Sequence, residues 1–177
     1  MKVNNHGRQG KRKLVTAFAV LSLITTTTFG VEIGKELIPD GNFDKKLDWV
    51  TGRGVSIAKI GDNSVLQFKG SYVFVKKIIN ISGAKELKLK MRMKTEGVEV
   101  GKAKWMDGRL VMRFLDKSGK MVGQWPRVFH EVGTTPWTDC ERVYEVPEGA
   151  ETIELKFGNF GSEGTVQFDD VSLAVVK

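Results

Sequence analysis

The sequence predicts an all-β protein, a two-sheet antiparallel β-sandwich, and three observations lead to this fold class. Residues 86–94 alternate strictly between apolar and charged side chains, and residues 109–114 and 152–157 largely repeat the pattern. A period of two with one charged face is typical of a strand that buries its other face. Clusters of glycine, proline, asparagine and aspartate separate the segments, and no amphipathic helix of convincing length interrupts them. Many short strands at such spacing indicate a sandwich.

The predicted strands cover most of the chain after residue 30. We expect them, in chain order, at 55–60, 64–68, 72–79, 86–94, 98–105, 109–114, 139–146, 152–157 and 165–175. Turns are predicted between them at 61–63, 116–119, 147–149 and 161–164, where residues that favour turn conformations gather. There is no internal repeat and no low-complexity tract, so residues 31–177 are interpreted as one domain.

Residues 1–30 have the layout of a secretory signal peptide. Five basic residues and no acidic residue accompany an apolar-leaning run at 14–24, and a polar stretch at 25–28 follows. The apolar run is about half the ~20 residues that a membrane-spanning helix needs. We therefore expect cleavage near Gly30, secretion to the extracellular space or periplasm, and no membrane partner afterwards. A retained membrane anchor is the alternative.

Charge and rare residues exclude several functional classes. The chain has a net charge of +7, but residues 31–177 contain 23 basic and 21 acidic residues, a net of +2. The domain therefore has no basic footprint for nucleic acid. Its single histidine, His130, and single cysteine, Cys140, cannot form a zinc site, and no nucleophile motif accompanies the histidine. We expect a non-catalytic monomer, with a carboxylate pair of the glycosidase type as a weaker alternative.

Two of the four tryptophans are candidates for ligand contact. Trp105 ends a predicted strand and Trp125 lies in a stretch flanked by glycine and proline, both beside arginines, whereas Trp49 and Trp137 are interpreted as packing residues. A flat aromatic ring can bury the apolar C–H face of a sugar while polar neighbours bind its hydroxyl groups. Loop packing is the alternative for Trp105 and Trp125.

A basic group lies next to these tryptophans in the sequence. Arg109 and Arg113 are expected on the same face of one strand, with Arg127 nearby and Asp107 just before the strand. The planar donor fork of arginine suits vicinal hydroxyl groups or a carboxylate. An ordinary solvated face is the alternative.

Acidic residues near both ends of the domain suggest a cation site. Asp44 follows an early turn, and Asp169 and Asp170 interrupt an apolar strand. Because a buried carboxylate needs a partner, and because calcium takes six to eight oxygen ligands, a calcium ion would satisfy these acids. Capping of backbone amides is the alternative.

Four motifs follow one another along the chain, at 37–44 with Trp49, at 133–137, at 146–150 and at 164–173. In this order they resemble the carbohydrate-binding modules of the galactose-binding-like jelly-roll type, as in families four, nine and twenty-two, and the resemblance spans residues 36–176. It implies a jelly roll of two antiparallel sheets and one structural calcium where the chain ends meet. The calcium would use Asp44, in the place of the usual glutamate, with Asp169 and Asp170.

The resemblance also implies a sugar cleft lined by aromatic and polar residues. We expect a secreted module that binds a polysaccharide or oligosaccharide through aromatic stacking and hydrogen bonds. The expected site residues are Trp105, Asp107, Arg109, Arg113, Trp125 and Arg127. The alternative is a structural or protein-interaction β-sandwich that has the fold without the sugar site.

Overall fold

The computed structural model describes residues 30–45, 47, 49–50 and 52–177, and this part of the chain is built from strands. The predicted signal peptide lies outside the described residues except for Gly30. In the described part, no helix is long and apolar enough to cross a bilayer. The strands are β1 (Val55–Ile60), β2 (Asn63–Lys69), β3 (Val73–Asn80), β4 (Glu86–Val98), β5 (Gly108–Leu115), β6 (His130–Glu131), β7 (Gly133–Glu145), β8 (Thr152–Asn159) and β9 (Thr165–Val175).

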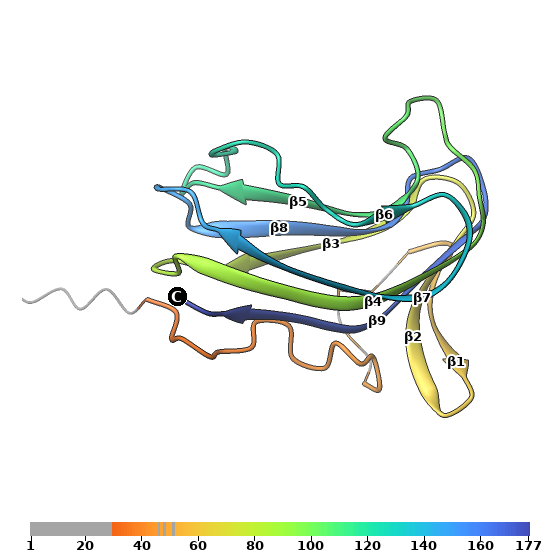
Figure 1. Ribbon diagram of the computed structural model, residues 1–177, viewed down its shortest axis with the longest axis horizontal. Helices are drawn as coiled ribbons and strands as arrows, with labels where there is room; N and C mark the ends of the chain where they lie inside the picture. The colour runs from red at the N-terminus through yellow and green to blue at the C-terminus, as the bar shows by residue number, and fades with distance from the viewer. Residues whose placement is uncertain (1–29, 46, 48, 51) are drawn as a thin grey trace, which may run out of the picture.

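The strands form two antiparallel sheets that pack face to face, as Figure 1 shows. One sheet has the order β1-β2-β9-β4-β7, and the other has the order β3-β8-β5-β6. Neighbours in each sheet are mostly distant in sequence, which is the crossing-over expected of a sandwich rather than a meander. The predicted all-β, two-sheet antiparallel fold is therefore confirmed.

The core lies between the sheets and follows the alternation seen in the sequence. The apolar residues of β4, β5 and β8 that were predicted to face inward are each at most 2% exposed: Leu87, Leu89, Met91, Met93, Leu110, Met112, Phe114, Ile153, Leu155 and Phe157. Phe157 of β8 contacts Phe168 of β9 across the interface, with ring centroids 5.3 Å apart. Each such large apolar side chain stabilises the fold by roughly 1.5–3 kcal/mol on burial.

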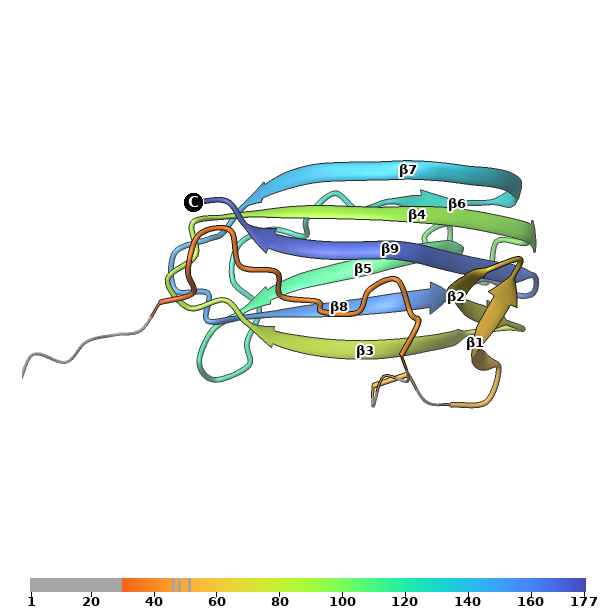
Figure 2. The same ribbon diagram turned by 90° about the horizontal axis from the view of Figure 1, so that it is seen from below.

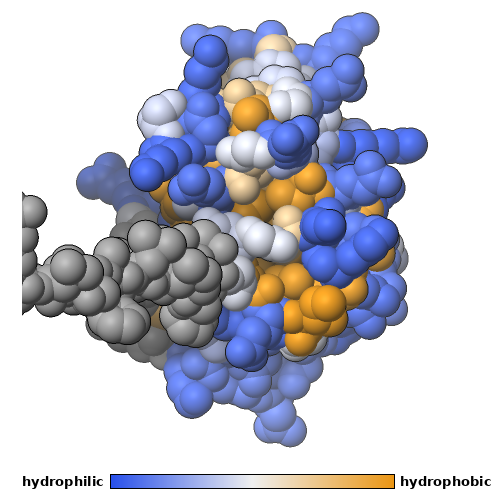
Figure 3. All heavy atoms as spheres, turned by 90° about the vertical axis from the view of Figure 1, so that its left-hand side faces the viewer, coloured by the Kyte–Doolittle hydropathy of each residue, from blue (hydrophilic) through white to orange (hydrophobic). Residues whose placement is uncertain are grey.

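The N-terminal segment of the domain completes the five-stranded sheet. Residues 30–45 run beside the second half of β9, where β2 no longer pairs with that strand (Figure 2). The amide of Leu37 donates to the carbonyl of Leu173 at 2.8 Å, and the amide of Val171 donates to the carbonyl of Gly41 at 2.9 Å. At the end of the sandwich where β9 finishes, hydrophobic side chains reach the surface in a band between hydrophilic ones (Figure 3).

Two local predictions need correction. The predicted strand at 98–105 is wrong, because β4 ends at Val98 and the chain then folds back on itself: the amide of Gly101 donates to the carbonyl of Met106 at 2.7 Å. The strand predicted at 139–146 begins earlier, at Gly133, and includes Pro136. Proline is tolerated there because β7 is an edge strand and because its pairing with β4 is irregular around that point.

Candidate functional site

The outer face of the four-stranded sheet carries the predicted arginines. We call it the β5 face and define it by the outward residues Phe74, Lys76, Ile78, Arg109, Val111, Arg113, Glu154 and Lys156. Arg109 and Arg113 both belong to β5 and point to the same side, as the alternation predicted. Two loops rise above the face at opposite ends of β5: residues 99–107 before it and residues 116–129 after it (Figure 1).

A groove of about 400 Å³ runs along β5 between these loops. It is lined by Trp105, Arg109, Val111, Met112, Trp125, Pro126 and Val128, and we call it the tryptophan groove. Trp105 is 50% exposed and Trp125 is 62% exposed, so neither ring is a core residue. The structure thus brings both candidate tryptophans and Arg109 to one cavity. A mostly apolar lining with one charged donor is the composition typical of a small-ligand site.

The far wall of the groove, residues 121–129, is attached to both sheets. The amide of Val122 donates to the carbonyl of Phe114 at 2.9 Å, which connects the segment to β5. From β7, Arg142 and Tyr144 donate to the carbonyl of Arg127 at 2.7 and 3.0 Å. Burial raises the pKa of Tyr144, so the phenol stays protonated and remains a donor. These bonds give Arg142, which interrupts the apolar alternation of β7, a defined role in positioning the wall.

Arg127 therefore contributes to the tryptophan groove mainly through its backbone carbonyl. Its carbonyl anchors the wall, whereas its exposed side chain does not line the tryptophan groove. Trp137 is also separate from the groove: it lies on β7 of the other sheet, where the guanidinium of Arg92 is 5.1 Å from its ring. Trp49 packs against Phe157, with ring centroids 6.0 Å apart.

Asp107 lies beneath Arg109 and fixes its orientation. The Asp107 side chain is 2% exposed. Arg109 donates from Nε and Nη2 to the two carboxylate oxygens at 2.5 and 2.6 Å, and His130 Nδ1 lies 3.1 Å from Oδ2. A carboxylate engaged in this way serves to orient the Arg109 guanidinium. Gly108 separates the two residues, and a Cβ there would lie 2.7 Å from Cγ2 of Val166 in the core.

A second ionic group occupies the other half of the β5 face. Arg113 donates from Nε and Nη2 to Glu154 Oε1 at 2.9 and 2.6 Å, and Lys156 Nζ lies 3.4 Å from the same oxygen. Burial of Glu154 opposes its ionisation, but the hydrogen bond from Arg113 and the charges of Lys156 and Arg113 outweigh this effect and lower its pKa. The Arg113 guanidinium also lies 6.0 Å from the Trp125 ring.

An aromatic cluster closes the opposite end of the face. The Phe74 and Phe160 rings stack at 5.3 Å, Tyr72 meets both edge-on, and Trp105 lies 6.4 Å from Phe160. Tyr72 is 52% exposed and has a φ of 51°, in the left-handed region that costs a non-glycine residue about 1 kcal/mol or more. Alternation along the chain could have indicated that Tyr72 and Phe74 share a face, but Phe160 has no such signal.

The three predicted metal ligands also meet in space. Asp44, Asp169 and Asp170 line one polar cavity of about 240 Å³, together with Asn42, Asp62, Asn63 and Ser64. Burial raises the pKa of Asp169, and the charges of Asp170 and Asp44 add to the increase. Arg92 offsets part of this charge, with Nη1 4.0 Å from Asp169 and 3.7 Å from Asp170.

The cavity fits a hard cation by its donors, which are carboxylate, amide and hydroxyl oxygens. Within the described ranges, however, no three His, Cys, Asp or Glu side chains converge closely enough to hold a metal by themselves. A bound ion would therefore need the neutral oxygens of this cavity as well.

The fold agrees with that of known carbohydrate-binding modules. No protein-family model and no curated protein matches the sequence. The CBM22-1 xylan-binding domain of Paenibacillus barcinonensis Xyn10C superposes with a TM-score of 0.56 at 14% identity, covering 84% of this chain and 99% of that domain. The chain has the jelly-roll fold of these modules. The resemblance stated from the sequence motifs is confirmed at the level of fold.

Two other similar solved structures are longer than this chain. The tandem CBM22-1–CBM22-2 domain of the same Xyn10C gives a TM-score of 0.55 at 12% identity, covering 83% of this chain and 46% of that one. The enzymatically active domain of the bacteriophage CBA120 tailspike protein 4 gives 0.49 at 17% identity. It matches 69% of this chain, which spans only 17% of the tailspike domain.

Proposed function

We propose that this protein is an exported, non-catalytic module that binds a polysaccharide in the tryptophan groove. One observation supports this most directly: Trp105 and Trp125, both at least half exposed, line the same groove as Arg109. Clustering of these rings on an open groove is the feature that separates sugar binding from a purely structural sandwich. The CBM22-1 domain that shares this fold is a xylan-binding domain, which supports a carbohydrate ligand.

The binding mode follows from the chemistry of the lining. Each tryptophan ring can stack on the C–H face of a sugar, and the apolar Val111 and Pro126 keep water away from that contact. Arg109 uses Nε and Nη2 to bind Asp107, so its Nη1 is left to donate to a hydroxyl group. Because Asp107 and the anchored wall hold these groups before the ligand arrives, little ordering entropy is lost on binding.

A hydrolase is less well supported by the same residues. The buried carboxylates beside the groove, Asp107 and Glu154, are both bound by arginine. A glycosidase acid needs a raised pKa, whereas the pKa of Glu154 is lowered.

The test compares exposed and packed tryptophans by affinity electrophoresis over a polysaccharide panel. We expect Trp105→Ala and Trp125→Ala each to weaken binding by about tenfold, since stacking of this kind contributes on the order of 1 kcal/mol or more. Both variants should keep their melting temperatures within a few degrees. Trp49→Ala is the matched control: it should lower the melting temperature and leave the affinity of the folded protein unchanged. Loss of stability without loss of affinity in the groove variants would reject the site.

We also propose that the cavity at Asp44, Asp169 and Asp170 holds a calcium ion as a structural brace. It lies where the N-terminal segment meets β9, on the other sheet from the tryptophan groove. Calcium should therefore raise stability with little effect on sugar affinity.

A further inference from the structure

The strands of the β5 face present an excess of positive charge. Four basic side chains project from them, Lys76, Arg109, Arg113 and Lys156, against the single acid Glu154. The buried Asp107 compensates Arg109, and Glu154 is shared between Arg113 and Lys156. The described charges on this face therefore do not cancel.

Lys76 and Lys156 show the imbalance most clearly. They are direct cross-strand partners on β3 and β8 and point to the same side. Among the residues that the structure describes, no acid lies within 4.0 Å of Lys76. Like charges directly opposite each other destabilise a sheet. Glu154 offsets this repulsion only in part, because it lies 3.4 Å from Lys156 and is shared with Arg113.

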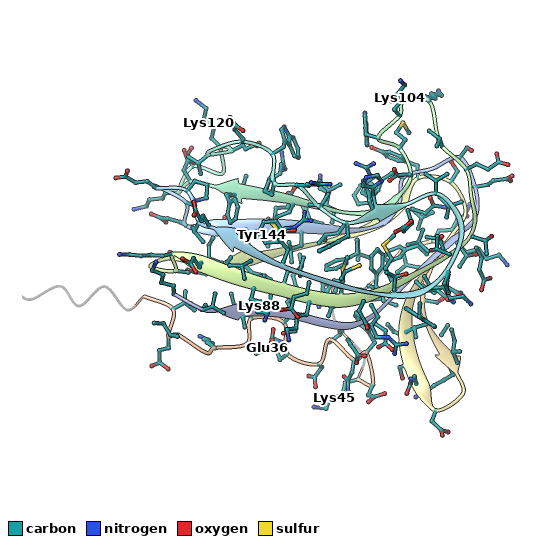
Figure 4. The ribbon with its side chains drawn as sticks, viewed as in Figure 1. Glu36, Lys45, Lys88, Lys104, Lys120 and Tyr144 are labelled. Atoms are coloured by element: carbon teal, nitrogen blue, oxygen red, sulfur yellow. The ribbon has the colours of Figure 1, made fainter. Side chains whose placement is uncertain are left out.

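The two flanking loops extend the positive surface on both sides. Lys104 and Lys120 project from their outer ends, as Figure 4 shows. Each loop carries a second lysine, Lys102 in one and Lys117 in the other. Asp116, an acid of the second loop, is already bound by the hydroxyl of Ser118 and by backbone amides, which lower its pKa. With Glu99 and Asp107 of the first loop included, the β5 face and its two loops hold nine basic and four acidic side chains, a net of +5. Residues 31–177 as a whole have a net charge of only +2, so the excess positive charge lies on this side of the protein.

Both arginines are also prepared to receive a planar anion. Arg109 and Arg113 bind their internal carboxylates through Nε and Nη2, which fixes each guanidinium and leaves Nη1 without a partner in the described part of the protein. Fixed guanidinium donors match the geometry of a carboxylate. We infer that the polysaccharide bound on the β5 face carries carboxylate groups, as a uronate-containing polymer does. This inference rests on the proposed function and adds the chemical class of the ligand.

The experiment compares polymers that differ only in their carboxylates. Polygalacturonate, alginate and glucuronoxylan are each assayed beside their carboxyl-reduced counterparts, using the purified protein in affinity electrophoresis. We expect at least one acidic polymer to bind about tenfold more tightly than its reduced form. This preference should disappear as ionic strength rises from about 0.05 M to about 0.5 M, because exposed charges are then screened.

Variants that remove lysine charges test whether the preference for acidic polymers arises on the β5 face. Lys76→Gln with Lys156→Gln should weaken binding of the acidic polymer by about tenfold, at a few-fold for each charge removed, and leave the reduced polymer unaffected. Lys88→Gln with Lys90→Gln is the matched control, because it removes the same net charge from β4 on the opposite sheet. Equal losses in both double variants would overturn the assignment to the β5 face.

The outcomes separate this inference from the proposed function. Binding of reduced or neutral polymers with no preference for any acidic form would overturn the carboxylate class and leave the polysaccharide module standing. Equally tight binding of a sulfated polymer such as dextran sulfate would also overturn carboxylate selectivity. Binding of no polymer in either panel would overturn the proposed function itself.

Discussion

Removing the carboxylate of Asp107 tests whether its pair with Arg109 is a buried interaction that holds the guanidinium in the tryptophan groove. The two side chains are 2% and 14% exposed, and two hydrogen bonds of 2.5 and 2.6 Å join them. Breaking a buried pair by deleting one partner costs about 3–5 kcal/mol, because the other charge stays uncompensated. Since Arg109 keeps some contact with solvent, we expect Asp107→Ala to lower the free energy of unfolding by about 3 kcal/mol, the lower end of that range.

The assay is a double-mutant cycle measured by urea unfolding. Asp107→Ala, Arg109→Ala and the double variant are compared with the parent protein, and the double variant should be about 2 kcal/mol more stable than the sum of the single losses predicts. Asp139→Ala is the control: this acid pairs with Arg92 at 3.7 Å but its side chain is 94% exposed, so it should change stability by less than about 0.5 kcal/mol.

Additive losses at Asp107 and Arg109, within about 0.5 kcal/mol, would refute the reasoning. Arg109 would then keep its orientation for steric reasons alone. Binding supplies a second readout, because a guanidinium freed from Asp107 should bind the polysaccharide less well even where the protein remains folded.

Three further predictions concern other charged or crowded positions. Calcium should raise the melting temperature, and Asp169→Asn should abolish that response while stabilising the calcium-free protein at neutral pH, because burial and the neighbouring carboxylates raise the pKa of Asp169 and so disfavour its ionised form; a calcium response that survives in the variant would exclude this cavity. Glu154→Gln should destabilise the protein at pH 7, because a carboxylate whose pKa is lowered by folding stabilises the folded state when it is ionised. The difference in unfolding free energy between the variant and the parent protein should vanish as the pH falls from 4.5 through the lower folded-state pKa. A pH-independent difference in urea unfolding would contradict this. Gly108→Ala should cost about 1–3 kcal/mol, because its Cβ would lie 2.7 Å from Val166, and an unchanged unfolding midpoint would show that the core relaxes freely.

The strands could be predicted where burial and alternation act together. Residues 86–94 have one face in the core and one in solvent, so the sequence pattern reports the structure directly. At 98–105 the pattern failed because Val98 is the end of a strand, and the apolar residues that follow it belong to a loop whose shape depends on local hydrogen bonds such as that from Met106 to Ala103. An alternating sequence pattern arises where alternate side chains of a strand are buried. In a loop that folds onto itself, burial does not alternate along the chain, so the pattern gives no reliable prediction there.

The site was predictable to the extent that its residues are neighbours in the chain. Trp105, Asp107 and Arg109 fall within five positions, and their proximity follows from the sequence alone. The partner of Arg113 could not be found in this way, because Glu154 is 41 residues away and meets it only through the register of β5 with β8. Alternation tells which residues share a face of a strand, but it does not tell which strands are adjacent.

The internal carboxylates explain how the open β5 face can present its two arginines in fixed positions. An exposed arginine samples many rotamers, and ordering such a side chain on binding costs about 0.5–1.5 kcal/mol. Because Asp107 orders Arg109 and Glu154 orders Arg113 when the protein folds, this entropy is not lost again on binding. Each carboxylate binds the Nε and Nη2 edge of its arginine and leaves Nη1 for a ligand. The same pairing lowers the net charge of each arginine site, so long-range attraction of an acidic polymer depends on Lys76, Lys156 and the loop lysines. Orientation and attraction are therefore assigned to different residues, and the salt dependence of binding should become weaker in the lysine variants.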